Sequence, residues 1–206
     1  DVFPSAIAQA STFDTEVVGE MTDIIRKQMY YVGFRQALSP VVDITRDPRW
    51  GRITETYGED AALTSAMASA FVKGIQGDEL KEGVLATAKH FAGHGITEGG
   101  LNMGRNIVSE RDMREIHCKP FQCAITEAGL KSVMNSYCSV NGEPVVGSKK
   151  MLTDILRGEM GFQGFVVSDY LSLDRLVDPF AVAENFEEAG IRAIQAGLDV
   201  EYPRSK

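Results

Sequence analysis

Five short apolar runs alternate with five helical stretches along the chain, and this alternation restricts the fold more than any other feature. The apolar runs, which we predict to be strands, span 38–44, 84–91, 131–137, 165–170 and 198–202. The stretches that we predict to be helices span 14–33, 60–74, 109–128, 148–158 and 182–196. Strands that are apolar on both faces and separated by helices are typical of a parallel sheet buried under crossover helices. The sequence therefore predicts an α/β protein.

Two architectures fit such a pattern: an open doubly wound sheet and a TIM-type (β/α)8 barrel. In both, the functional side chains gather in the loops that follow the carboxyl ends of the strands. A complete barrel takes about 250 residues and eight strand–helix units. The 206 residues and five units of this chain therefore correspond to a partial barrel.

Capping residues agree with the expected helix boundaries. Asp14 suits the N-cap of the first helix, and Gly33 closes it. Ser109 and Asp112 have the spacing of a capping box, with an acid at its third position. These signals place the first and third helices independently of the apolar pattern.

Composition excludes several classes of protein. Hydrophobic residues make up 44% of the chain and charged residues 24%, which is ordinary for a globular domain. The apolar runs are far shorter than the roughly 18 residues of a membrane span. The formal charge of −8 opposes phosphate backbones and anionic lipids. We expect a small neutral or cationic partner, and neither nucleic acid nor a membrane.

Cysteine and histidine spacings favour neither a disulfide framework nor a metal site. The three cysteines, which we expect to be small buried side chains, are Cys118, Cys123 and Cys138. His90 and His94 have the spacing of zinc ligands, but Phe91 occupies the place of the catalytic Glu, and the glycines around His94 oppose a helix. The same glycines weakly resemble a dinucleotide-binding loop, in which Gly99 falls one residue late. We expect no metal and no cofactor.

Polar side chains follow every predicted strand. They are Asp43, Lys89, His90, Asn135, Ser136, Tyr137, Ser168, Asp169, Tyr170, Asp199 and Glu201. Any one of them can be explained as a strand-end hydrogen bond. Because parallel strands end at one rim, we expect the whole set to converge there and to form a site.

Asp169 is the strongest candidate for covalent or acid–base chemistry. It follows the apolar run 165–167 and precedes the aromatic Tyr170, so a rigid strand delivers a carboxylate beside an apolar surface. Lys89 and His90 on a neighbouring strand offer hydrogen-bond donors and positive charge, which suit the binding of hydroxyl groups.

The loop 46–52 holds three arginines and the only Trp of the chain. Guanidinium groups bind hydroxyls or carboxylates, and an indole stacks on a sugar ring. For Arg46 and Arg49 we favour pairing with aspartate, which would latch the loop, over contact with a ligand.

Several motifs together closely resemble glycoside hydrolase family 3, in particular its β-glucosidase-like members. In chain order they are SPVVD (39–43), RDPRWGR (46–52), YGED (57–60), KHF (89–91), VMNSY (133–137), NG (141–142) and GFQGFVVSDY (161–170). They cover nearly the whole chain in the order of the family, so the resemblance is specific.

The resemblance implies a TIM-type catalytic barrel and a retaining mechanism in which Asp169 is the nucleophile. It also implies which residues bind the substrate: Arg52, Lys89, His90, Arg105, Met134, Tyr137 and Tyr170. The first three would bind sugar hydroxyls, with Arg105 as a further Arg from the loop after Lys-His. Met134 and Tyr137 would line the pocket, and Tyr170 replaces the Trp of many relatives as an aromatic wall.

The resemblance also implies that the chain, 1–206, is only part of a catalytic domain. Retaining glycosidases need two carboxyl groups, and in this family the acid/base usually comes from a second domain after the barrel. The family's first strand, with its sugar-binding Asp, would precede Asp1, and the segment between Asp169 and Gly190 is short. We therefore expect five middle units of a barrel, without the C-terminal domain and with the acid/base supplied from outside.

Other activities remain as alternatives. A branch of the family that acts on N-acetylglucosaminides carries an Asp-x-His acid/base after KHFxGHG; here 89–95 match, but 96–100 lack that pair, and Glu98 is a poor substitute. A glycoside phosphorylase or a non-catalytic carbohydrate-binding fragment also fits these residues. Glucose and xylose are the leading sugars.

Overall fold

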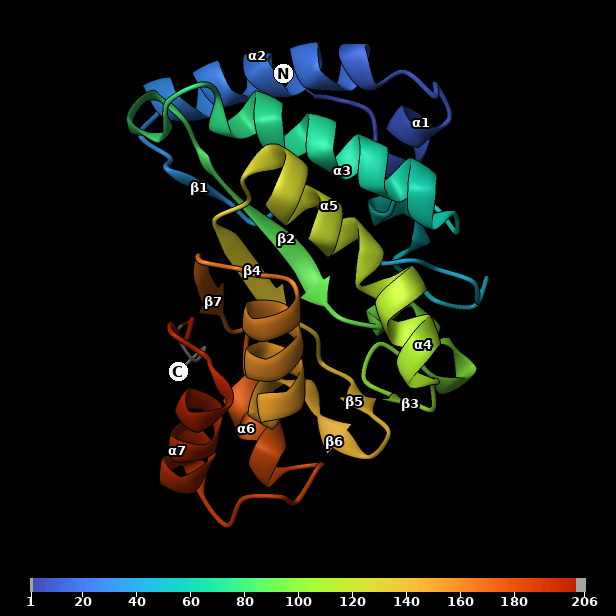
Figure 1. Ribbon diagram of the computed structural model, residues 1–206, viewed down its shortest axis with the longest axis vertical. Coiled ribbons are helices and arrows are strands. Elements are labelled where there is room, and N and C mark those ends of the chain that lie inside the picture. Colours follow the sequence, from blue (N-terminus) through green and yellow to red (C-terminus); the bar gives the residue numbers. More distant parts are fainter. Residues whose placement is uncertain (1, 203–206) are drawn as a thin grey trace.

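A four-stranded parallel sheet lies at the centre of the computed structural model, which describes residues 2–202 (Figure 1). Its strands, in spatial order, are β1 (Gln36–Ala37), β2 (Leu85–Phe91), β4 (Ser132–Asn135) and β7 (Phe165–Val167). All neighbours are parallel, and the spatial order follows the chain. A doubly wound sheet reverses its strand order at a switch point. The unreversed order is that of consecutive units of a (β/α)8 barrel.

The first and last predicted strands pair less than the sequence suggests. In the run 38–44 a single bridge joins Val41 to Lys89, because Pro40 has no N–H to donate to a ladder. In 198–202 a single bridge joins Val200 to Val167. The fifth strand is therefore present only as a bridge at the edge of the sheet.

Helices separate the strands, as expected, but their number and type differ from the prediction. The α-helices are α1 (Ala6–Ala10), α2 (Thr15–Tyr31), α3 (Ala61–Gln76), α4 (Glu110–Asp112), α5 (Lys119–Ala128), α6 (Ser172–Val177) and α7 (Phe186–Ala196). Two stretches expected to be regular are π-helical: Met113–His117, between α4 and α5, and η7 (Lys150–Glu159). The helices α1 and α6 are additional to the five that the sequence predicts.

The predicted helix caps are confirmed. The Asp14 carboxylate accepts hydrogen bonds from the backbone N–H groups of Glu16 and Val17, both at 3.0 Å. The Ser109 hydroxyl accepts a bond from the N–H of Asp112 at 3.0 Å and lies 2.8 Å from its carboxylate. These bonds satisfy N–H groups that have no partner inside the helix.

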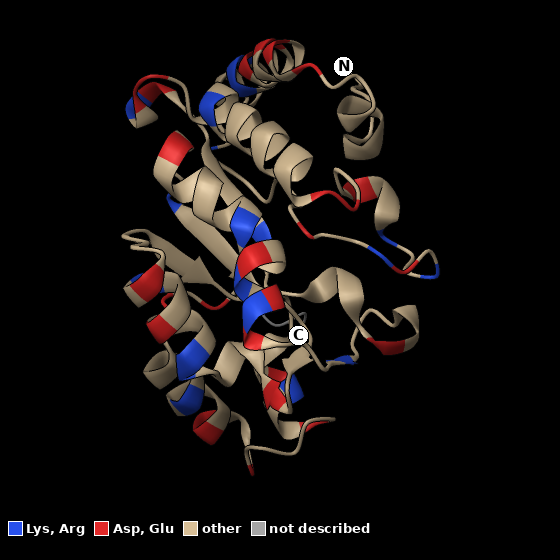
Figure 2. Ribbon diagram, turned by 45° about the vertical axis from the view of Figure 1, so that its right-hand side comes forward, with Lys and Arg blue, Asp and Glu red and all other residues tan. Residues whose placement is uncertain are grey.

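The helices α2, α3 and α5 lie side by side, each packed against the next, and α3 and α5 contact β2 (Figure 1). Between these elements, the ring of Phe91 meets that of Phe121 edge-on, with centroids 5.1 Å apart. The three cysteines are free thiols and buried, as predicted. Acidic and basic residues lie mainly on helices and loops, where they intermix (Figure 2). Within residues 2–202, no helix has the length and apolar character needed to cross a bilayer.

A small second sheet interrupts the strict alternation of strands and helices that the sequence predicts. The strands β5 (Ser139–Val140) and β6 (Glu143–Pro144) form an antiparallel hairpin, and β3 (Arg105–Asn106) lies parallel to β5. Asn141 and Gly142 form the turn with φ of 51° and 92°. Two positive φ angles in a two-residue Asn-Gly loop are typical of a tight hairpin turn.

Gly164 lies where β7 approaches β4, and we expect Gly164→Ala to destabilise the fold by about 3 kcal/mol. A Cβ there would lie 2.1 Å from the backbone oxygen of Lys131, so β7 would have to shift against its neighbour. The control is Gly190→Ala in α7, where nothing lies within 4 Å of the added Cβ. This variant should gain about 0.5–1 kcal/mol. Urea unfolding measures both, and equal stabilities for the two variants would contradict the prediction.

Candidate active site

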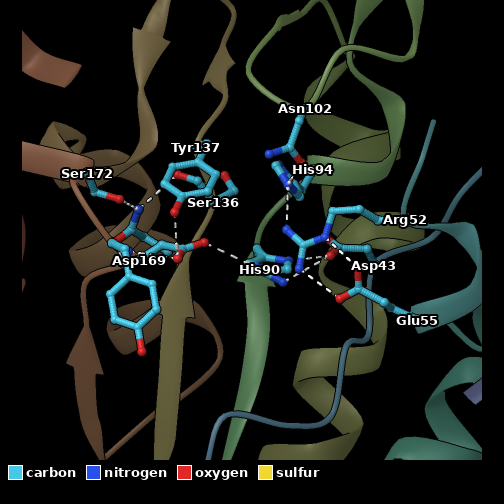
Figure 3. A network of polar contacts seen from close by, with 12 residues as sticks. Asp43, Arg52, Glu55, His90, His94, Asn102, Ser136, Tyr137, Asp169 and Ser172 are labelled. Atoms are coloured by element: carbon cyan, nitrogen blue, oxygen red, sulfur yellow. Dashed lines mark hydrogen bonds and ion pairs between the residues drawn. The ribbon is translucent and has the colours of Figure 1, made fainter. Parts of the chain in front are cut away.

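Polar side chains from successive strands meet at the carboxyl end of the sheet (Figure 3). His90 lies near the end of β2, Tyr137 two residues after β4, and Asp169 two residues after β7. The pairing of β2 with β4 shifts register between Lys89 and Phe91, at the point where β2 reaches this cluster. The ends of β2, β4 and β7 therefore converge as predicted.

The carboxylate of Asp169 is held mainly through one of its two oxygens. Its Oδ1 accepts hydrogen bonds from the hydroxyl of Tyr137, at 2.8 Å, and from the N–H of Tyr170, at 2.7 Å. Its Oδ2 lies 3.6 Å from Nε2 of His90, and the side chain is only 10% exposed. The N–H of Asp169 donates to Oδ1 of Asn135, which ties the residue to β4. The side chain is thus fixed, while Oδ2 remains free to react.

Asp43 and His90 form a buried pair beside Asp169. Oδ2 of Asp43 accepts a hydrogen bond from the backbone N–H of His90 at 3.2 Å and lies 2.8 Å from Nδ1 of its ring. Both side chains are 1% exposed. Burial raises the pKa of Asp43 to about 6 and, with help from Arg52, lowers the pKa of His90 to about 3. At neutral pH the pair is therefore a carboxylate and a neutral imidazole.

Arg52 points into the same cluster from the loop after β1 (Figure 3). Its Nε and Nη2 donate to the two carboxylate oxygens of Glu55 at 2.8 and 2.9 Å, a bidentate geometry that fixes the guanidinium plane. Its Nη1 lies 3.4 Å from Nε2 of His94, which also lies 3.1 Å from Oδ1 of Asn102. The ring of Trp50 packs edge-on against His94 with centroids 5.3 Å apart.

Lys89 is half-buried and lines a pocket with Glu55 and Tyr57. Burial, followed by repulsion from Arg52, lowers the pKa of its ammonium group. Among residues 2–202 no carboxylate lies within ion-pair distance of this group. Its donors are therefore available to a ligand.

The remaining predicted residues lie at varied distances from this cluster. Met134 is buried in β4. Tyr170 is half-exposed, with its ring 6.0 Å from that of Tyr202. Arg105 is exposed on β3 and pairs with Glu98 at 2.7 Å.

Asp199 does not belong to the rim, and its inclusion in the converging set is wrong. Its Oδ2 accepts a hydrogen bond from the N–H of Val166, inside β7, and pairs with Arg157 at 2.5 Å. Because Val200 pairs with Val167, the preceding Asp199 lies beside β7 and not beyond its carboxyl end. In the loop after β1, Arg49 pairs with Asp47 at 2.7 Å as predicted, but among residues 2–202 Arg46 forms no ion pair, so that half of the predicted latch is wrong.

Three members of the cluster have no role that the sequence alone could assign. In the sequence Asp43 is visible only as a strand-end acid, and His94 only as a rejected zinc ligand within the motif 89–95, because their contacts arise in the folded chain. Nothing in the sequence singles out Asn102. Within residues 2–202, no three His, Cys, Asp or Glu side chains are grouped in a way that would hold a metal ion.

The sequence and the fold of this chain are similar to those of known glycosidases. Residues 1–206 match the Glycosyl hydrolase family 3 N terminal domain. A β-xylosidase of Formosa agariphila is 40% identical over 97% of the chain, and a periplasmic β-glucosidase of Salmonella typhimurium is 34% identical over 97%. A crystal structure of a mutant β-glucosidase from Listeria innocua in complex with laminaribiose has a TM-score of 0.94 and 35% identity over 99% of the chain.

The chain spans only about a quarter of these relatives: 28% of the xylosidase, 26% of the periplasmic glucosidase and 29% of the Listeria chain. The match confirms that the sheet is part of a TIM-type barrel. With its motifs in order, its strand ends converging and its fold superimposable on that of solved relatives, the chain belongs to the N-terminal domain of glycosyl hydrolase family 3.

Proposed function

We propose that this chain carries the nucleophile and the sugar-binding residues of a retaining glycosidase that releases a terminal β-linked glucose or xylose. The observation that carries the proposal is the geometry of Asp169, whose Oδ1 is held by Tyr137 and Tyr170 while Oδ2 stays free. The sugars are those named for the similar β-xylosidase and β-glucosidase.

In the proposed reaction Oδ2 of Asp169 attacks the anomeric carbon. A bond forms between them as the bond to the leaving oxygen breaks, and that oxygen takes a proton from a second carboxyl group. Asp43 is committed to His90 and Glu55 to Arg52, so neither is suited to this role. We assign the acid/base to a segment outside the chain, in keeping with the greater length of the relatives. Water then releases the sugar from Asp169.

The ring hydroxyls of the sugar are assigned to Lys89, His90 and Arg52, each of which interacts electrostatically with Asp169. Lys89 supports this assignment most directly, because its ammonium group is half-buried without a carboxylate partner in the described chain. Met134 and Tyr170 are assigned to the pocket wall. Arg105 would have to leave Glu98 to reach the sugar.

The proposal is tested by covalent trapping with a dinitrophenyl 2-deoxy-2-fluoro-β-glucoside and the matching xyloside. The electron-withdrawing fluorine slows release of the sugar, so the full-length gene product should accumulate one sugar on the peptide that contains Asp169. Mass spectrometry locates the label. Sugar binding without label would favour a non-catalytic carbohydrate-binding role.

Substrate class is tested with a panel of aryl β-glycosides that includes the N-acetylglucosaminide. We expect turnover of the glucoside or the xyloside at a rate that does not depend on phosphate. A rate that rises with phosphate, together with release of a sugar phosphate, would instead indicate a phosphorylase. Preference for the N-acetylglucosaminide would contradict the choice of sugar.

Tyr137→Phe should lower kcat/KM by about 10- to 100-fold, because it removes a hydrogen bond to a charged group. Burial and the neighbouring Asp169 raise the pKa of the Tyr137 phenol, so the hydroxyl stays protonated and donates. The guanidinium carbon of Arg175 lies 4.7 Å from the ring centre and holds the ring in place. Steady-state kinetics measure the effect. Tyr31→Phe, at an 85% exposed tyrosine, is the control and should match the wild type.

A further inference from the structure

Asp43 has no part in the chemistry described so far, yet it is among the most buried charged groups of the chain. It is 2% exposed, and one of its oxygens, Oδ1, has no hydrogen-bond partner among the described residues. A buried carboxylate with an unsatisfied oxygen costs stability. Its other oxygen contacts His90, which in turn faces Asp169. The cost is explained if the contact serves the reaction.

The hydrogen bonds of Asp43 determine which nitrogen of His90 carries a proton. Oδ2 accepts from the backbone N–H and lies 2.8 Å from Nδ1, so an ionised Asp43 requires a proton on Nδ1. A neutral imidazole has only one ring proton. Nε2 is then left without a proton and presents a lone pair to the site.

The distance between Nε2 and Asp169 agrees with this tautomer. Nε2 lies 3.6 Å from Oδ2 of Asp169, which is longer than a hydrogen bond. A protonated Nε2 would donate to Oδ2 and draw electron density from the atom that attacks the sugar. An unprotonated Nε2 leaves Oδ2 free and accepts a hydrogen bond from a sugar hydroxyl.

We infer that Asp43 is a positioning residue, which holds His90 in the tautomer with its proton on Nδ1 and so keeps the nucleophilic oxygen of Asp169 free. This inference rests on the proposed function of Asp169. Asp43 does not touch the sugar and acts through His90.

Other charges around the pair support the same state. Arg52 and His94 face Asp43 from the loops after β1 and β2, and His117 faces it from the π-helical turn before α5. Arg52, Asp169, Lys89 and Glu55 face His90. Burial and the positive charges of Arg52 and Lys89 lower the pKa of the imidazole, whereas the carboxylates of Asp169 and Glu55 raise it; burial is the largest of these effects and keeps the ring neutral. Arg52 also favours the ionised form of Asp43.

The tautomer can be measured directly in the full-length gene product labelled with ¹⁵N-histidine. Long-range ¹H–¹⁵N correlation distinguishes a protonated ring nitrogen from an unprotonated one, and the signals that disappear in His90→Gln assign the ring. At pH 7.5 we expect the proton on Nδ1. A proton on Nε2 in the wild type would overturn the inference, and this measurement needs no altered Asp43.

Asp43→Asn tests the kinetic consequence. The carboxamide can donate to Nδ1 and so move the ring proton to Nε2, and we expect kcat/KM to fall by about 10- to 100-fold, mostly in kcat. The wild-type rate should also decline as pH falls through about 6, where Asp43 takes up a proton. This acidic limb of the pH–rate profile should be absent from the variant. An Asp43→Asn enzyme that is folded and keeps both the rate and the limb would refute the inference.

Two controls accompany these measurements. Asp154→Asn changes an exposed aspartate of η7, away from the site, and should alter neither the tautomer nor the rate. Trapping on wild-type Asp169 is measured in parallel. If no label forms while His90 shows a proton on Nδ1, the proposed function fails and the tautomer stands. If label forms while the proton lies on Nε2, the proposed function stands and the role of Asp43 fails.

Discussion

Asp169→Asn is expected to lower kcat/KM for an aryl β-glucoside or β-xyloside by roughly 10⁴-fold or more, because the variant lacks the attacking carboxylate oxygen. The carboxamide has nearly the same size, and it can still accept from Tyr137 and from the N–H of Tyr170. Folding should therefore be retained, and the loss should appear in the formation of the covalent intermediate. Pre-steady-state release of dinitrophenol measures that step.

A chemical rescue sharpens this test. In Asp169→Gly the space of the carboxylate is open, and azide should restore turnover of a dinitrophenyl β-glycoside by forming the α-glycosyl azide. Inversion at the anomeric carbon is expected because azide attacks from the face that Asp169 occupied. The control is Asp154→Asn, at an exposed aspartate of η7. Rescue by azide with a β-linked product, or normal activity of Asp169→Asn, would contradict the assignment of the nucleophile.

Acid should unfold the domain steeply between pH 6 and pH 4, with a loss of roughly 3 kcal/mol in the free energy of unfolding per pH unit. Burial lowers the pKa of His90 to about 3 and that of His94 and His117 to about 4. In the unfolded chain all three titrate near 6.5. A lowered pKa gives stability that is present above 6.5 and is lost as pH falls toward the folded value.

Asp43 acts in the opposite direction. Its pKa rises from 3.8 to about 6 on folding. Between pH 6 and pH 4 the folded state therefore takes up one proton, on Asp43. The unfolded state gains three on its histidines, and the difference of two protons sets the slope. Urea unfolding at half-unit pH steps measures it. His117→Gln, which removes one titrating group outside the catalytic cluster, should halve the slope. A free energy of unfolding that stays constant from pH 6.5 to 4.5 would contradict the prediction.

The features that the sequence predicts well are those set by local chemistry. The alternating apolar runs give the parallel sheet, and Asp14 and Ser109 give the helix caps, because both patterns depend on residues close in the chain. The Asn141–Gly142 hairpin also has a local signal, although the dipeptide entered the prediction only as part of a family motif. The turn needs positive φ angles at both positions, and Asn and Gly are the residues that adopt them most readily.

The features that could not be predicted depend on the register of strand pairing and on contacts between residues far apart in the chain. Asp199 looks like any other strand-end acid, and only the pairing with Val166 shows that it lies beside the strand. The buried residues of η7, Met151, Leu152, Ile155 and Leu156, have the spacing of an ordinary α-helix, so periodicity cannot reveal its π-helical turns. Asp43 acquires its role from a 2.8 Å contact with a residue 47 positions later. Such contacts follow from the assembled sheet and from no local pattern.

The small sheet of β3, β5 and β6 has an evolutionary consequence. It joins the loop after β2 to the loop after β4: Ser139 N–H donates to Gly104, and both polar ends of the Asn141 amide bond the backbone of Val108. An insertion in either loop would break these bonds unless the other loop changed with it. The two loops are therefore expected to vary together in length among relatives. Substrate preference at this rim would then be inherited as a matched pair of loops.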